Sequence, residues 1–129
     1  MELENKIIVI TGAGSGIGRA LAIRFKAEGA KQIVAVDING ENAQATAEMI
    51  DGVAMTADVS NEDDIVRVIE ETETQIGPID LFCSNAGVGM GPDLNSPNSH
   101  WQISWDINVM SHLYAARHLV PRMVPRGGG

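Results

Sequence analysis

Short apolar runs alternate along the chain with longer segments whose apolar side chains recur every three or four residues. The runs occupy residues 6–11, 32–38, 53–57 and 79–84, and their length is typical of buried parallel strands. The intervening segments predict helices over residues 19–28, 41–50 and about 100–124. A further helix is predicted between the second and the last of these, beginning at an N-cap at Ser60 and ending at the Gly-Pro pair at 77–78. This alternation predicts an α/β fold, in which right-handed crossovers place helices on both faces of a parallel sheet.

The apolar faces of these helices can be read from their spacing. Ile17, Leu21 and Phe25 recur every four residues, and we expect them to pack on the sheet. The third helix repeats the pattern with Ile65 and Ile69. The last helix carries apolar residues all round, which predicts packing on both of its sides, with a proline near its end. Its apolar residues are Trp101, Ile103, Trp105, Val109, Leu113, Ala116 and Val120.

A glycine-rich loop, TGAGSGIG, occupies residues 11–18 between the first strand and the first helix. Glycine lets a phosphate reach backbone N–H groups, and a helix N-terminus adds unpaired N–H groups and a positive dipole end. The spacing is neither G-x-G-x-x-G nor a P-loop, but G-x-x-x-G-x-G through Gly12, Gly16 and Gly18. The loop indicates a dinucleotide site, although a plain turn or a methyltransferase-type site would look similar.

Composition and charge restrict the class of protein. The 129 residues make one domain, and a net charge of -8 disfavours nucleic acid and anionic membranes as partners. No apolar run reaches transmembrane length and the N-terminus lacks a basic start, so we expect a cytoplasmic protein without a membrane contact. The one cysteine and three histidines lack partners at ligand spacing, so no metal site is expected.

Asp37 closes the second predicted strand, where a carboxylate can accept hydrogen bonds from an adenosine ribose. Its negative charge would repel the 2′-phosphate of NADP, and Ser15 in the glycine loop adds no positive charge. Asp37 therefore favours NAD over NADP. The alternative is an aspartate that only ends a strand.

Two further polar positions follow strands. Asp58 comes after the third strand, where it can contact the adenine amino group with Val59 nearby, or act instead as a turn or helix-capping residue. Residues 84–87, Ser-Asn-Ala-Gly, follow the fourth strand. Their small side chains let the backbone approach a cofactor, and the Asn85 amide can bridge neighbouring strand ends. An ordinary turn has the same composition.

Taken in order, these features resemble the short-chain dehydrogenase/reductase family. The resemblance implies a Rossmann-type sheet with strand order 3-2-1-4 and a homo-oligomer formed through the long helix at about 100–124. It also implies that Asn108 helps to hold a catalytic proton-relay water; a helix asparagine facing solvent or neighbouring backbone is the alternative. The cofactor-binding residues that it implies are Thr11, Gly12, Ser15, Gly16, Ile17, Gly18, Asp37, Ile38, Asp58, Val59, Asn85, Ala86 and Gly87.

The chain departs from the family at the catalytic motif. The family's chemistry uses a Tyr with a Lys four residues later and a Ser upstream, whereas the only tyrosine here, Tyr114, is followed four residues on by His118. We therefore expect residues 1–129 to be a partial dinucleotide-binding domain without the carboxyl-terminal strands and the Tyr-x-x-x-Lys helix, and inactive alone. The expected function is the NAD-binding part of an oxidoreductase that transfers hydride between NAD(H) and an alcohol or carbonyl substrate. The alternative is a non-catalytic nucleotide-binding or interaction module. A Gly/Pro/Asn-rich loop at 89–99 would border the substrate cleft.

Overall fold

A four-stranded parallel sheet forms the centre of the computed structural model, which describes residues 2–89 and 93–129. The strands are β1 (Ile7–Thr11), β2 (Gln32–Asp37), β3 (Val53–Thr56) and β4 (Leu81–Cys83). They pair in the order β3-β2-β1-β4, which confirms the expected strand order. All four strands are shorter than the predicted runs, and the run residues that lie outside the strands are Lys6, Ile38, Ala57, Ile79, Asp80 and Ser84.

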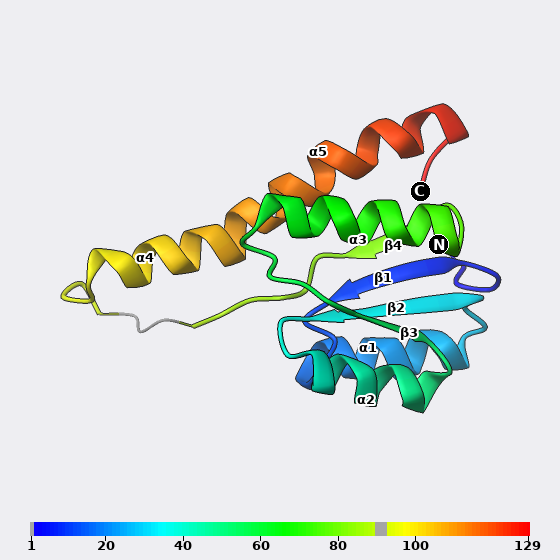
Figure 1. Ribbon diagram of the computed structural model, residues 1–129, viewed down its shortest axis with the longest axis horizontal. Coiled ribbons are helices and arrows are strands. Elements are labelled where there is room, and N and C mark those ends of the chain that lie inside the picture. The colour runs from blue at the N-terminus through cyan, green and yellow to red at the C-terminus, as the bar shows by residue number, and fades with distance from the viewer. Residues whose placement is uncertain (1, 90–92) are drawn as a thin grey trace.

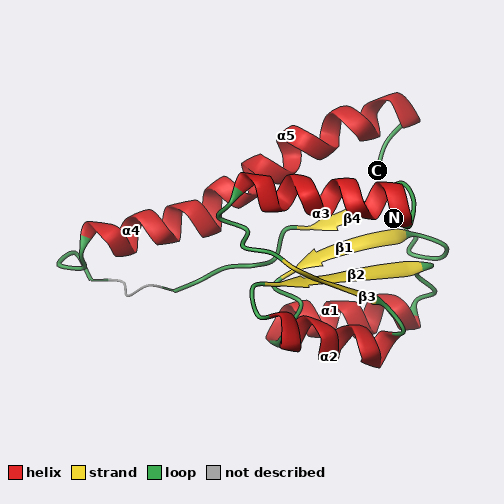
Figure 2. Cartoon of the chain, in the orientation of Figure 1, coloured by secondary structure: helices red, strands yellow, loops and turns green. Residues whose placement is uncertain are grey.

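Helices cover both faces of the sheet, as predicted. α1 (Gly16–Ala27) and α2 (Gly40–Ile50) lie on one face, and α3 (Glu62–Gln75) and α5 (Ser111–Met123) lie on the other (Figure 1, Figure 2). Alternate side chains of β1 point to opposite faces: Ile8 and Ile10 join the core under α1 and α2, and Val9 joins the core under α3 and α5. All three are fully buried, and each contributes about 1.5–3 kcal/mol by leaving water.

Two details of the predicted helices are wrong. Ile17 does not pack on the sheet but is 73% exposed, because the first turn of α1 lies beyond the carboxyl end of β1. Ser60 does not cap the third helix, since its hydroxyl donates to the Asp58 carboxylate at 2.7 Å. Asn61 is the N-cap, and its side-chain oxygen accepts the N–H of Asp63 at 3.0 Å.

The long carboxyl-terminal helix consists of α4 (Asn98–Trp105), a π-helical turn (Asp106–Met110), α5 and a 3-10 turn (Val124–Arg126). The expectation that it packs on both sides is wrong within the described residues. α4 has no buried residue and extends away from the sheet (Figure 1). Trp101 and Trp105 are 52% and 55% exposed, and α5 buries only Ser111, Ala115 and Leu119. Residues 90–92 of the loop expected at 89–99 lie outside the described residues.

Ion pairs join α3 to α5. The Glu62 carboxylate accepts hydrogen bonds from Arg117 at 2.7 Å and from His118 Nε2 at 2.8 Å. The hydrogen bond from His118, followed by that from Arg117, holds the pKa of Glu62 below its ordinary value of 4.5. Further along the two helices, Glu70 and Glu73 pair with Arg122, and Glu73 also pairs with Arg126. These contacts hold α5 against α3, and α5 in turn positions the π-helical turn that precedes it.

Candidate nucleotide-binding site

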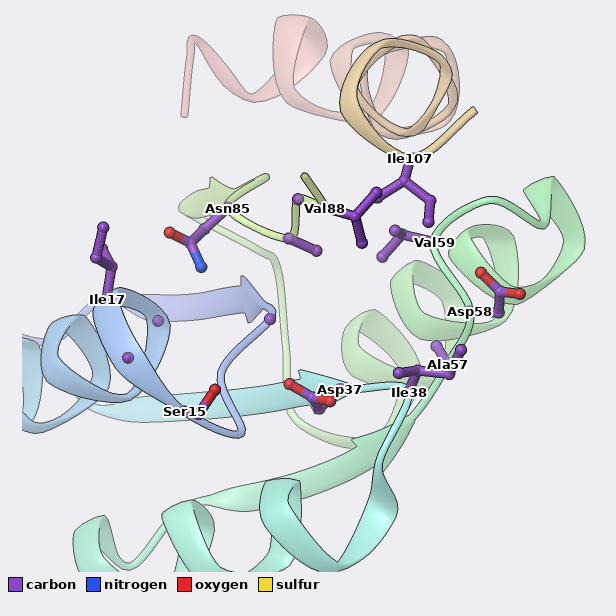
Figure 3. A pocket seen from close by; sticks show the side chains of 15 residues that line it. Ser15, Ile17, Asp37, Ile38, Ala57, Asp58, Val59, Asn85, Val88 and Ile107 are labelled. Atoms are coloured by element: carbon purple, nitrogen blue, oxygen red, sulfur yellow. The ribbon is translucent and has the colours of Figure 1, made fainter. Parts of the chain in front are cut away.

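A pocket of about 370 Å³ lies at the carboxyl ends of the strands (Figure 3). It occupies the crevice beside β1 and β4, where the strand order reverses and where open α/β sheets bind ligands. Four loops contribute to its wall, one after each strand, and the π-helical turn completes it. Its lining consists of Gly12, Ser15, Gly16, Ile17, Gly18, Asp37, Ile38, Ala57, Asp58, Val59, Asn85, Ala86, Gly87, Val88 and Ile107.

The glycine loop needs glycine for two different reasons. Gly12 has a φ of +66°, and a Cβ there would lie 2.9 Å from the Cα of Ala86, so the residue must be small. A Cβ on Gly18 would overlap the carbonyl oxygen of Gly12. Gly16, with a φ of +51°, faces open space at the start of α1. The N-terminus of α1 lies at the pocket, which Gly16, Ile17 and Gly18 line. The first turn of this helix contains no acidic residue, so no carboxylate there offsets its positive dipole end.

Asp37 lies at the end of β2 and fixes the glycine loop. Its Oδ2 accepts the N–H of Gly14 at 2.8 Å, and its Oδ1 accepts the N–H of Asn39 at 2.9 Å. On the other side of the same residue, the Arg19 guanidinium donates to the Gly14 carbonyl oxygen and, at 2.9 Å, to Thr46 Oγ1. The carboxylate therefore has a fixed orientation while it lines the pocket.

Thr11 lies behind the pocket and does not line it, since it is 1% exposed. Its hydroxyl oxygen accepts the N–H groups of Asn85 at 3.0 Å and Ala86 at 3.1 Å, and it donates to the Cys83 carbonyl at 3.3 Å. Asn85 Nδ2 returns a bond to the Thr11 carbonyl at 3.0 Å, which is the bridge between strand ends that the sequence predicts. Thr11 therefore supports the loop after β4 from behind. The residues of this loop that line the pocket include Asn85, Ala86 and Gly87.

Asp58 has one of its two anticipated roles in the described structure. Its Oδ1 accepts the backbone N–H of Ser60 at 2.9 Å and the Ser60 hydroxyl at 2.7 Å, which is the role of a turn residue. It also lines the pocket, together with Val59. Figure 3 shows Asp58 and Val59 on one side of the pocket and Ile17 and Asn85 on the other.

Asn108 lies in the π-helical turn and uses its whole amide group on one residue. Its Oδ1 accepts the N–H of Val88 and its Nδ2 donates to the Val88 carbonyl, both at 2.9 Å. This is the contact with neighbouring backbone that stood as the alternative to a water-holding role. The side chain does not line the pocket, but it ties the wall residue Val88 to the helix that carries Ile107.

The match to known sequences decides the family. A family model described as short chain dehydrogenase matches residues 6–129. The chain belongs to this family. The bovine (Bos taurus) short-chain dehydrogenase/reductase family 16C member 6 is 35% identical over 99% of this chain. The 7alpha-hydroxysteroid dehydrogenase of Escherichia coli (strain K12) is 29% identical over the whole chain.

Solved structures of short-chain dehydrogenases share the fold. A 7 alpha-hydroxysteroid dehydrogenase complexed with NADH and 7-oxo glycochenodeoxycholic acid superposes with a TM-score of 0.92 at 30% identity, covering 99% of this chain and 52% of that one. This chain covers 42% of the bovine relative and 52% of the bacterial one. It therefore spans about half the length of the curated relatives that it matches.

Three lining residues were not anticipated for this member of the short-chain dehydrogenase family: Ala57, Val88 and Ile107. All three directly adjoin predicted site residues in the sequence, namely Asp58, Gly87 and Asn108, so adjacency was the available signal. Within residues 2–89 and 93–129, no group of three potential metal ligands lies together, and no described helix has the length and apolarity to cross a bilayer.

Proposed function

We propose that this chain is the NAD-binding part of a short-chain dehydrogenase/reductase that transfers hydride between NAD(H) and an alcohol or carbonyl carbon of a small molecule. One observation carries the proposal. A single pocket combines an open glycine loop at a helix N-terminus with a carboxylate held at the end of the adjacent strand. A dinucleotide needs both, because it has an anionic pyrophosphate and a ribose with two hydroxyl donors.

The proposed roles follow the arrangement of the walls. The pyrophosphate binds at Gly16, where the open space in front of the backbone matches the positive end of α1. Asp37 accepts the hydroxyl groups of the adenosine ribose, and Ile38, Asp58 and Val59 bind the adenine. The nicotinamide end lies toward Asn85, Ala86 and Gly87, with Val88 and Ile107 excluding water from that part of the pocket. Nicotinamide supplies the hydride acceptor or donor when the dinucleotide is bound.

NAD is the preferred cofactor in this proposal because of charge. A 2′-phosphate on the ribose would lie near Asp37, and two like charges at short range repel strongly in a pocket of reduced dielectric constant. The adjoining lining residues Ser15 and Ile38 are uncharged. A 2′-phosphate would therefore face the negative charge of Asp37, and neither Ser15 nor Ile38 would supply a compensating positive charge.

The chemical step requires groups beyond those of these residues. The 129 residues contain no Tyr-x-x-x-Lys motif, and the family resemblance assigns proton transfer to that tyrosine. In this proposal the described residues contribute to catalysis by positioning the cofactor. Asn108 holds the backbone of Val88, and Val88 is part of the pocket wall beside the proposed nicotinamide end. Turnover by these residues alone is not expected.

We also propose a homo-oligomer through the long helix and a cytoplasmic location. Five large apolar side chains of α4, the π-helical turn and α5 are between 40% and 55% exposed in the chain as described, and apolar surface of this kind is typical of interfaces. They are Trp101, Trp105, Val109, Leu113 and Val120. Sedimentation of the purified protein over a range of concentrations tests this part of the proposal.

The test of the central proposal is a fluorescence titration of the purified chain with NADH and, in parallel, with NADPH. Saturable binding that prefers NADH is the expected result. A chain whose circular dichroism spectrum shows folded α/β structure but which binds neither nucleotide contradicts the proposal. Equal affinity for both nucleotides would leave nucleotide binding intact and remove Asp37 as the basis of selectivity.

A further inference from the structure

Two side chains of α3 hold the backbone that leaves β3. Asp64 Oδ2 accepts the N–H of Asp58 at 2.8 Å. Arg67 Nη2 donates to the carbonyl oxygen of Thr56 at 2.8 Å, and the same nitrogen pairs with Asp64 Oδ1 at 3.1 Å. Together Asp64 and Arg67, the β3–α3 clamp, grip the chain on both sides of Ala57.

The clamp acts on a wall of the pocket. Ala57, Asp58 and Val59 line that wall, whereas neither Asp64 nor Arg67 does. The N–H of Asp58 hydrogen-bonds the Asp64 carboxylate and is the main cause of a pKa of Asp64 below its ordinary value of 3.8. Asp64 is therefore ionised at neutral pH, which makes its bond to the Asp58 backbone a charge-assisted one.

Asp58 has an oxygen available for a ligand. Its Oδ1 is occupied by Ser60, while no donor among the described residues reaches Oδ2. A carboxylate oxygen attracts the 6-amino group of adenine, a donor, and repels the 6-oxo group of hypoxanthine, an acceptor. That distinction depends on where the short Asp58 side chain is held, because a hydrogen bond weakens steeply with misalignment.

We infer that Asp64 is a positioning residue for base recognition: by holding the Asp58 backbone, it places the Asp58 carboxylate to accept the amino group of adenine. The inference rests on the proposed function, in which this side of the pocket binds the adenine of NAD. Asp64 acts through Asp58 and does not itself touch the nucleotide. Its loss therefore removes the preference for adenine, and not only affinity.

Asp63 provides a matched control. It precedes Asp64 in the same first turn of α3, is exposed, and its carboxylate makes no hydrogen bond within the part of the chain that the structure describes. Asp63→Ala changes the net charge and the charge near the helix N-terminus as Asp64→Ala does. Only Asp64→Ala opens the clamp.

The experiment measures the Kd of NADH and of its reduced hypoxanthine analogue for the wild type, Asp64→Ala, Asp63→Ala and Asp58→Ala. The wild type and Asp63→Ala are expected to prefer NADH by about tenfold or more, the effect of one hydrogen bond to a charged group. In Asp64→Ala and Asp58→Ala the two constants are expected to agree within about twofold. Asp64→Asn, which keeps a side-chain acceptor, is expected to restore part of the preference.

Each result has a defined meaning. An Asp64→Ala protein that weakens both nucleotides but keeps the wild-type preference overturns the inference, since Asp64 would then be only structural. A wild type that binds both nucleotides equally also overturns it, while leaving the proposed function in place. A folded wild type that binds neither overturns the proposed function and this inference with it. If Asp64→Ala does not fold by circular dichroism, Asp64→Asn replaces it in the comparison, and its preference for NADH is expected to lie between those of the wild type and Asp58→Ala. An undiminished wild-type preference in folded Asp64→Asn would then overturn the inference.

Discussion

In the proposed function Asp37 determines the cofactor selectivity, and in the structure it also fixes the glycine loop. Two substitutions separate these roles. Asp37→Ala removes the acceptors of the Gly14 and Asn39 N–H groups together with the negative charge. Asp37→Asn removes the charge but keeps one oxygen, which can still accept the Gly14 N–H. Gly14 is buried and Asn39 is exposed, so water can replace only the bond to Asn39.

The expected magnitudes follow from these contacts. Loss of a ribose hydrogen bond to a charged acceptor costs about 1.5–3 kcal/mol, which weakens NADH binding by about 10- to 150-fold in either variant. Loss of the repulsion on a 2′-phosphate favours NADPH by about 1–2 kcal/mol after solvent screening at this half-buried site. The Asp37→Ala protein also leaves the buried Gly14 N–H without an acceptor, which lowers its unfolding free energy by about 1–3 kcal/mol.

The assay combines NADH and NADPH titrations with urea unfolding of the wild type and both Asp37 variants. Asp63→Asn, which removes one exposed carboxylate, is the control for the change in net charge. We expect the NADH preference to fall at least tenfold in both Asp37 variants, and stability to fall mainly in Asp37→Ala. A stable Asp37→Asn protein with wild-type affinity for NADH and an unchanged preference would refute the assignment of Asp37 to the ribose.

Three other substitutions test separate contacts. Gly18→Ala adds a Cβ against a carbonyl oxygen of the loop and should lower the unfolding free energy by about 1–3 kcal/mol; an unchanged urea midpoint would show that the loop adapts. Asn108→Leu removes both bonds to Val88 and, because these bonds are exposed and water can replace part of them, should cost about 0.5–1.5 kcal/mol in stability. Thermal unfolding checks this, and unchanged stability would mean that this tie contributes little. The hydrogen bond from His118 lowers the pKa of Glu62 in the folded protein. The ionised Glu62 carboxylate therefore stabilises the fold at pH values above its ordinary pKa, and this stabilisation is lost as the pH falls through the folded-state pKa. Urea unfolding of Glu62→Gln between pH 7 and 3 should therefore lose less stability on acidification than the wild type, and parallel curves would contradict this.

The strands and the glycine loop could be predicted because their signals are local. A short apolar run is buried wherever helices cover both faces of a sheet, and β1 and β2 follow their apolar runs closely. Glycines between a strand and a helix identify the loop from adjacent residues alone. Strand order is not local in this sense, and it was predicted through the family resemblance.

The roles of Thr11 and Asn108 depend on partners that are distant in the sequence. Thr11 accepts the N–H of Asn85, 74 residues away, and Asn108 binds Val88, 20 residues away. No spacing rule connects such pairs. The predicted cofactor-binding residues other than Thr11 line the pocket, but the sequence could not separate the residues that line it from those that support it from behind.

Competition between neighbours explains the error at Ser60. Both Ser60 and Asn61 are residue types that cap helices, and the pattern of polar residues does not rank them. The Asp58 carboxylate takes the Ser60 hydroxyl, which leaves Asn61 as the cap. Ile17 has a similar explanation: helical spacing places it on the same face as Leu21, but the sheet ends before it, and the pocket begins there.

The loops after β1, β3 and β4 that line the pocket are each held by side-chain hydrogen bonds, and these side chains lie between residues 11 and 108. A wall fixed in this way loses little conformational entropy when a ligand binds. We therefore expect nucleotide affinity to depend on these supports as well as on the groups that touch the nucleotide. We expect the adenosine side of the site to form from residues 1–129, because the hydrogen bonds that support it in the described structure join residues of this segment. The supporting pairs are Asp37 with Gly14, Arg19 with Gly14, Asp64 with Asp58, Thr11 with Asn85 and Ala86, and Asn108 with Val88.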